Sequence, residues 1–146
     1  MNSKPIKGAV IAGALGALLL WIIQLVMMQM PGGQPPLGNA FAGKLFGLQG
    51  TTATIVGLLL FVGAGAVWGA IYAAVVPRIN WMSGLIFGVV PWLVVMFAVL
   101  PILGKPIFAG GDLKTILVPL VLNCIWGAFT GALAPKFEAP RPPVVA

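Results

Sequence analysis

The chain has 146 residues, of which 60% are hydrophobic and only 7% are charged. Soluble domains carry roughly 25% charged residues, so this composition excludes a water-covered surface and predicts one covered by lipid. The formal net charge is +6, from 8 Lys and Arg against 2 acidic residues. These basic residues lie at the ends of apolar segments and do not alternate with aromatic residues, a pattern that argues against nucleic-acid binding and for anchoring at a membrane face.

Four apolar segments follow one another along the chain, at about 8–30, 51–76, 81–103 and 113–134. A hydrocarbon core of about 30 Å requires roughly 20 apolar residues in a helix, so each segment is long enough to cross a bilayer. The first is longer than the apolar region of a cleaved signal peptide, and we expect it to be retained. The sequence therefore predicts an all-α membrane fold, with a four-helix transmembrane domain over 1–137 and a Pro-rich cytoplasmic tail over 138–146.

The basic residues are unevenly divided between the two ends of the predicted helices. One end carries Lys4, Lys7, Arg78, Lys136 and Arg141, and the other carries Lys44, Lys105 and Lys114. The end that is richer in Lys and Arg usually stays in the cytoplasm. We therefore expect a multi-pass protein of the cell inner (plasma) membrane with both termini in the cytoplasm.

The ends of the second and fourth helices resemble each other. Residues 67–79 and 125–137 share an aliphatic-Trp-Gly-Ala start, then small residues, then proline, a basic residue and an apolar residue. Residues 37–43 and 103–110 also match, through Leu-Gly followed by Phe-Ala-Gly. This pattern predicts a tandem, parallel repeat of a two-helix hairpin, with its pseudo-twofold axis along the membrane normal.

Glycines spaced four residues apart indicate where helices approach each other closely, because helices in lipid associate through small residues. The predicted helix-packing residues are Gly65, Gly69, Gly84, Gly88, Gly127 and Gly131. Two interpretations fit these stripes, namely internal packing of the bundle and a docking face for a partner helix. Pro91 and Pro119 lie inside the third and fourth helices and are expected to kink them.

A few polar and aromatic side chains lie deep within the apolar segments. Gln24, Asn123 and Thr130 are expected either to form hydrogen bonds between helices or to line a polar path. Trp68 and Trp126 are expected to pack across the pseudo-twofold axis, with contact to a pigment or a lipid as the alternative.

The residues that catalysis requires are missing from the predicted helices. The chain has no His and a single Cys, and Asp112 and Glu138 lie outside the apolar segments. No carboxylate pair, activated nucleophile or metal-ligand set can be assembled from these groups, so the sequence predicts no catalytic residue, cofactor or metal. Asp112 is instead expected to cap the N-terminus of the fourth helix.

The Gly-Ala spacing of the second helix, Pro91-Trp92 and residues 100–104 resemble small, mostly uncharacterised bacterial inner-membrane proteins of the YagU-like kind. Members of this kind often carry histidines in the helices that match the second and fourth. This chain has none, so the resemblance implies neither a metal or haem site nor a particular activity.

Two functions from different classes fit these observations. The first is a non-catalytic structural or accessory subunit of a larger respiratory or photosynthetic membrane complex, which would contact the bilayer and other membrane subunits. The second is a small channel or uncoupled transporter that works as a homo-oligomer, because four helices enclose too little space for a roomy pore.

Overall fold

A computed structural model describes residues 4–138, 143 and 145 of the chain. Within that part, four helices are long and apolar enough to cross a membrane, at Ile6–Met28, Gly50–Val75, Trp81–Ile102 and Leu113–Phe137. The prediction of four helices long and apolar enough to cross a membrane is therefore confirmed, and the helix ends lie within about three residues of the predicted bounds. The first is α1 (Ile6–Met28) and the second is α3 (Gly50–Val75). The fourth consists of α7 (Leu113–Leu133) and the 3-10 helix η3 (Ala134–Phe137). The described residues contain no strand.

A short additional helix, α2 (Leu37–Phe46), lies in the segment that was expected to be a loop. Pro35 and Pro36 come directly before it, and Gly47 ends it in the left-handed conformation, with φ of 66°. A preceding proline and a terminal left-handed glycine are ordinary helix boundaries. α2 packs against α3, where a Cβ added to Gly38 would lie 2.4 Å from the carbonyl oxygen of Gly57.

The third span is interrupted. It consists of α4 (Trp81–Phe87), α5 (Val89–Val94), the π-helical turn η1 (Val95–Val99) and α6 (Leu100–Ile102). The break at Gly88 precedes Pro91, which lacks an amide hydrogen and cannot continue the helical hydrogen-bond ladder. α7, in contrast, continues through Pro119 as a single helix.

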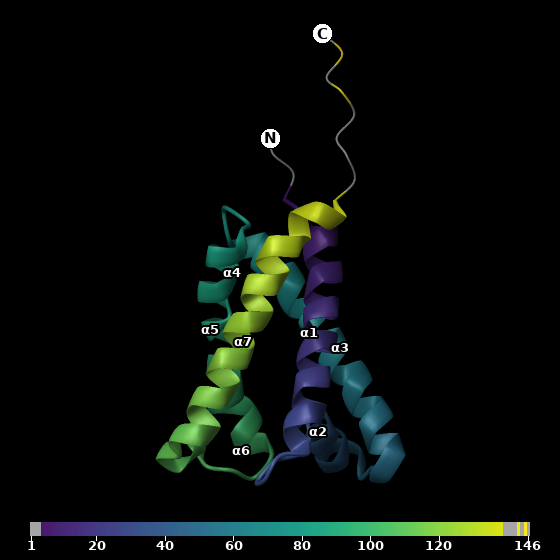
Figure 1. Ribbon diagram of the computed structural model, residues 1–146, viewed down its shortest axis with the longest axis vertical. Coiled ribbons are helices and arrows are strands. Elements are labelled where there is room, and N and C mark those ends of the chain that lie inside the picture. The colour runs from purple at the N-terminus through teal and green to yellow at the C-terminus, as the bar shows by residue number, and fades with distance from the viewer. Residues whose placement is uncertain (1–3, 139–142, 144, 146) are drawn as a thin grey trace.

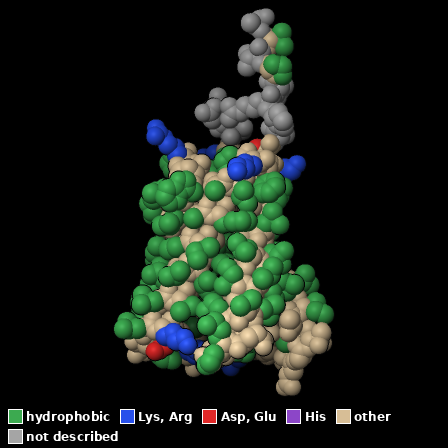
Figure 2. Space-filling model, viewed as in Figure 1, with side chains coloured by type: hydrophobic (Ala, Val, Ile, Leu, Met, Phe, Trp, Pro, Cys, Tyr) green, Lys and Arg blue, Asp and Glu red, His purple; other side chains and the backbone are tan. Residues whose placement is uncertain are grey.

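The helices form two hairpins that diverge from one end of the molecule (Figure 1). α1 packs along α3 and also contacts α7, and α7 in turn packs along α4. The start of α1 and the end of α7 lie together at the end where the helices converge, and α2 lies at the end where they diverge (Figure 1). Apolar side chains cover the middle of the molecule, and Lys and Arg lie at its two ends (Figure 2).

The two segments that match as loops in the sequence adopt different conformations. Residues 37–43 lie in α2, whereas Phe108, Ala109 and Gly110 all have positive φ within the 3-10 segment η2 (Ile107–Gly111). Left-handed backbone is unfavourable for Phe and Ala. Aromatic contacts hold the turn, because the ring of Phe108 lies 5.5 Å from Trp92 and 5.2 Å from Phe97 between centroids. Most of the predicted Pro-rich tail, at 139–142, 144 and 146, lies outside the described residues.

Asp112 caps α7, as the sequence predicts. Its carboxylate accepts hydrogen bonds from the backbone amide of Thr115, at 3.0 Å, and from the Thr115 hydroxyl. The Thr115 hydroxyl, followed by the Thr115 amide and the charge of Lys114, lowers the pKa of Asp112 below its usual value. Because the folded-state pKa is the lower one, the cap is present at neutral pH and is lost only as the pH falls through that lowered pKa.

The other acidic residue, Glu138, joins the end of the described chain to the start of α1. Its Oε1 accepts a hydrogen bond of 2.6 Å from the backbone amide of Gly8, in the first turn of α1. This amide has no partner within its own helix, and a carboxylate is favourable at the positive end of the helix dipole. Gly8 also fits closely against η3, because an added Cβ would lie 2.0 Å from the carbonyl oxygen of Ala134.

We expect Glu138→Ala to lower the free energy of unfolding by about 0.5–2 kcal/mol, as the loss of other helix caps does. Glu138→Gln, which keeps an acceptor oxygen, should cost less. Lys136→Ala is the matched control, because Lys136 is exposed in η3 and forms no hydrogen bond within the described residues. Unfolding in detergent micelles measures the free energy of unfolding of the three variants, which should be lowest for Glu138→Ala. Equal stability of the Glu138→Ala and Lys136→Ala proteins would contradict this prediction.

Candidate functional site

Glycines join α1 to α3 along a first helix seam. A Cβ added to Gly13 would lie 2.3 Å from the carbonyl oxygen of Gly65, and one added to Gly69 would lie 2.1 Å from that of Ala9. These distances are far below an ordinary van der Waals contact, so the two backbones touch directly. Such an approach is possible only where side chains are absent or very small.

A second seam joins α4 to α7 in the same way. A Cβ added to Gly84 would lie 2.0 Å from the carbonyl oxygen of Gly127, and one added to Gly127 would lie 2.0 Å from that of Gly84. Cβ atoms added to Gly88 and Gly131 would lie 2.3 and 2.2 Å from backbone carbonyl oxygens of the facing segments. All six glycines predicted to pack helices thus lie in seams inside the bundle.

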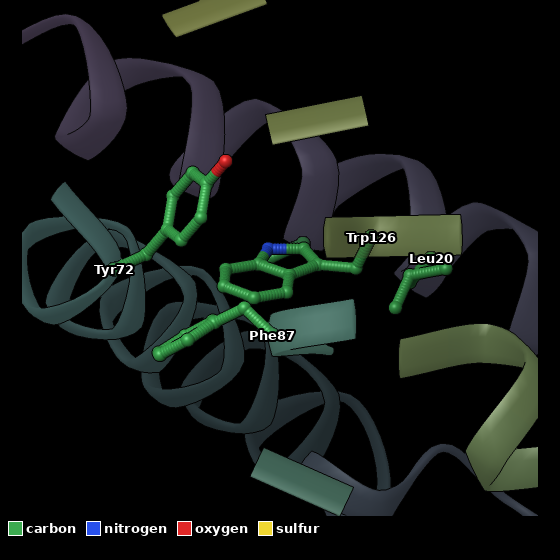
Figure 3. Close-up of a cluster of buried hydrophobic side chains, with 5 residues drawn as sticks. Leu20, Tyr72, Phe87 and Trp126 are labelled. Atoms are coloured by element: carbon green, nitrogen blue, oxygen red, sulfur yellow. The ribbon is translucent and has the colours of Figure 1, made fainter. Parts of the chain in front are cut away.

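Side chains from all four spans meet in a central cluster. Leu20 of α1, Tyr72 of α3, Phe87 of α4 and Trp126 of α7 are buried there, and Figure 3 shows the three aromatic side chains lying close together. The rings of Tyr72 and Phe87 are 5.1 Å apart between centroids. The indole Nε1 of Trp126 donates a hydrogen bond of 3.0 Å to the carbonyl oxygen of Gly13. Trp126 therefore links α7 of the second hairpin to α1 of the first.

Tyr72 also fixes the turn between α3 and α4. Its hydroxyl lies 3.0 Å from the carbonyl oxygen of Asn80 and 2.7 Å from Oγ of Ser83. Asn80 and Ser83 form a reciprocal capping box at the start of α4. These bonds hold the two hairpins together at the end where the helices converge.

A cavity of about 290 Å³ lies where the hairpins diverge, between α1, α2 and α3 on one side and α5, η1 and α7 on the other. Its lining includes Phe41, Phe61, Trp68 and Trp126. Leu45, Leu60 and Val94, which also line it, are 51%, 38% and 39% exposed, so the cavity opens sideways between α3 and α5. We call this space the lateral cleft. Because its mouth lies on membrane-spanning helices, it faces the hydrocarbon of a surrounding bilayer.

The three predicted polar residues do not come together. Asn123 lines the lateral cleft, and its side-chain amide donates to the carbonyl oxygen of Pro119, at 2.8 Å. Gln24 instead accepts a hydrogen bond of 3.2 Å from the first amide of α2, that of Leu37. Thr130 is fully buried near the end of α7, and its hydroxyl has no hydrogen-bond partner within the described residues. These positions do not form a continuous path.

The two predicted tryptophans each contact the other hairpin. Trp126 lies against α1, where a Cβ added to Gly16 would come within 2.9 Å of its ring. Trp68 of α3 meets Phe87 of α4 edge to face, with 6.3 Å between ring centroids. Both rings also line the lateral cleft.

The lateral cleft offers almost no reactive chemistry. Asn123 is the only lining residue with an amide, hydroxyl or charged side chain. Within the described residues, no group of three or more His, Cys, Asp or Glu is placed to hold a metal ion. The sequence did not predict the apolar lining residues Phe41, Leu60, Phe61 and Val94. They have no distinguishing motif, because they are aliphatic or aromatic residues in segments where most neighbours are also apolar.

These features define a four-span helical membrane protein with an apolar cleft that opens to the side. The chain belongs to DUF6789, described as a family of unknown function, which it matches over residues 3–143. No curated protein and no solved structure matches it significantly.

Proposed function

We propose that the chain is a non-catalytic structural or accessory subunit of a larger membrane complex, of the respiratory or photosynthetic kind. The supporting observation is its outer surface. α3 is the least buried of the four spans, and its side chains Ile55, Leu59 and Val67 are 55%, 67% and 60% exposed. Within the described part of the chain, the charged side chains lie outside the four spans or in the first or last two residues of a span. Such a surface can pack against the transmembrane helices of a larger protein within the bilayer.

The proposal extends to the protein's repeat, orientation and relatives. The reciprocal contacts of Trp68 and Trp126 with the opposite hairpin support a tandem repeat of two parallel hairpins. The excess of basic residues at the end of the molecule where α1 starts and α7 ends supports cytoplasmic termini in a cell inner (plasma) membrane. A relationship to YagU-like proteins is part of the same proposal. The partners would be the bilayer and other membrane subunits, or further copies of the chain, without nucleic acid.

Extraction from native membranes in mild detergent, followed by native mass spectrometry, tests the proposal. We expect stoichiometric recovery with larger membrane proteins. Recovery of only the chain itself, as a monomer or homo-oligomer, would overturn the accessory-subunit proposal.

A small homo-oligomeric channel or uncoupled transporter is the second candidate, and Asn123 is the observation that favours it. Its polar side chain lines a cleft near the middle of the bundle. The central cluster of Tyr72, Phe87 and Trp126 fills the middle of a single chain beyond the cleft. A path across the membrane would therefore have to form between copies of the chain.

Asn123→Leu separates the two candidates. Its amide bonds only to Pro119 of its own helix within the described residues, so we expect the substitution to change stability by about 1 kcal/mol or less and to leave the complex intact. Flux through liposomes that contain the unsubstituted protein, together with loss of that flux in the Asn123→Leu protein, would favour the channel instead.

A further inference from the structure

We propose that the lateral cleft binds one acyl chain of an anionic phospholipid, taken from the leaflet on the α2 side of the membrane. The cavity of about 290 Å³ is close to the lower limit of roughly 300–1,000 Å³ for ligand pockets, so it suits a slender molecule. Its lining is apolar apart from Asn123, which excludes a charged or strongly polar group from the interior. A hydrocarbon chain satisfies both conditions.

The depth of the cleft matches one leaflet. On the third span, its lining runs from Val99 to Pro91, eight residues or about 12 Å along a helix. On α7 its lining residues are Asn123 and Trp126, ten and thirteen residues, or about 15 and 20 Å, from the start of the helix at Leu113. Half of a hydrocarbon core of roughly 30 Å is about 15 Å. The cleft thus extends from the α2 end to about the middle of the membrane, where Trp68 and Trp126 close it.

The charges at the α2 end favour an anionic headgroup. Lys44 lies on α2 beside Leu45, which is at the exposed edge of the cleft. Lys105 and Lys114 lie at the same end of the molecule, and Asp112 is the only acidic residue there. The carboxylate of Asp112 is already bonded to Thr115. The remaining positive charge would meet a headgroup phosphate while the chain occupies the cleft.

The divergence of the two hairpins explains why the lateral cleft is open to a lipid. In both helix seams, glycines bring the backbones into direct contact. Between α3 and α5, no close glycine contact among the described residues closes the half of the bundle near α2, and α2 forms one wall through Phe41 and Leu45. A bilayer lipid is the molecule that the exposed mouth meets at the highest concentration.

The test is native mass spectrometry of the isolated full-length chain in detergent, with added phosphatidylglycerol or phosphatidylcholine of identical acyl chains. We expect one tightly held phosphatidylglycerol per chain. Ala64→Phe and Val94→Phe place a ring in the cleft from opposite walls and should each weaken binding by about tenfold or more. Val67→Phe is the matched control, because Val67 is 60% exposed on α3 and does not line the cleft. It should bind lipid as the unsubstituted chain does.

Lys44→Gln tests the headgroup contact. It should reduce the preference for phosphatidylglycerol over phosphatidylcholine by about fivefold, as expected for one basic residue near a lipid headgroup. Equal binding by Ala64→Phe, Val94→Phe and Val67→Phe proteins would overturn the inference, and so would equal binding of the two lipids by the unsubstituted chain. The inference rests on the proposed membrane role but not on a partner. If the chain is recovered with larger membrane proteins but shows no preference for phosphatidylglycerol, this inference alone is refuted. If the chain is recovered without a partner but binds phosphatidylglycerol specifically, only the accessory-subunit proposal is refuted.

Discussion

Gly69→Ala should lower the free energy of unfolding by about 2–3 kcal/mol, or more if the helices cannot separate, because the added methyl group overpacks the seam between α1 and α3. The new Cβ would lie 2.1 Å from the carbonyl oxygen of Ala9 and 3.4 Å from the Cα of Gly13. Backbone atoms cannot rotate away as a flexible side chain can. Relief therefore requires the two helices to move apart along the whole seam.

Gly63→Ala on the same helix is the matched control for this effect. Nothing lies within 4 Å of the Cβ that it would add, and its backbone is helical. Because alanine is favoured over glycine in a helix by up to about 1 kcal/mol, this substitution should be neutral or stabilising. Equilibrium unfolding in mixed micelles measures both variants. Equal stability of Gly69→Ala and Gly63→Ala would show that direct backbone contact does not hold the seam.

Trp126→Ala should lower the free energy of unfolding by about 3–5 kcal/mol, the usual cost of deleting a large buried aromatic side chain. Trp126 is 4% exposed and packs with side chains from all three other spans. The lateral cleft lies beside it, so the deletion would extend an existing cavity instead of letting the bundle close.

Trp126→Phe separates the hydrogen bond from the packing. It keeps most of the apolar volume but removes the hydrogen bond from the indole to the carbonyl oxygen of Gly13, which still accepts its helical bond within α1, at a cost of about 0.5–1.5 kcal/mol. Trp81→Phe serves as the control, because Trp81 is 54% exposed at the start of α4. The same unfolding assay in micelles compares the free energies of unfolding of these variants. A Trp126→Phe protein as stable as the Trp81→Phe protein would show that the indole hydrogen bond of Trp126 does not link the hairpins.

The four spans were predictable because the bilayer imposes a length and an apolar composition that few other folds require. Asp112 was predictable as a cap because its position depends only on neighbouring residues. α2 was not predicted, although Pro35, Pro36 and Gly47 provide local boundary signals for it. Its ten residues are too few to produce a transmembrane signal, and its position depends on tertiary contact between Gly38 and Gly57.

The glycine stripes could be recognised in the sequence, but their pairing could not. Gly13, which opposes both Gly65 and Gly69, was not among the predicted packing residues. Which stripe faces which depends on the crossing of the helices. The sequence also did not predict the π-helical turn at Val95–Val99, which follows the break at Gly88 in the third span.

The lateral cleft was not predictable, because a cavity is produced by the divergence of helices and not by any residue type. Asn123 and the two tryptophans were singled out for their polarity and their repeat, and all three line it. Gln24 was selected on the same grounds, yet it stabilises the start of α2. A polar residue in an apolar segment therefore identifies a constrained position without specifying its partner.

Photo-crosslinking in native membranes tests the central proposal most directly, with a photoreactive residue placed at Leu59 or Val67 on the exposed face of α3. The proposal predicts a crosslink from this face to the same larger membrane protein that co-purifies with the chain, and none from the buried position Ala17. Crosslinks only to lipid or to a second copy of the chain, from both positions on α3, would contradict it.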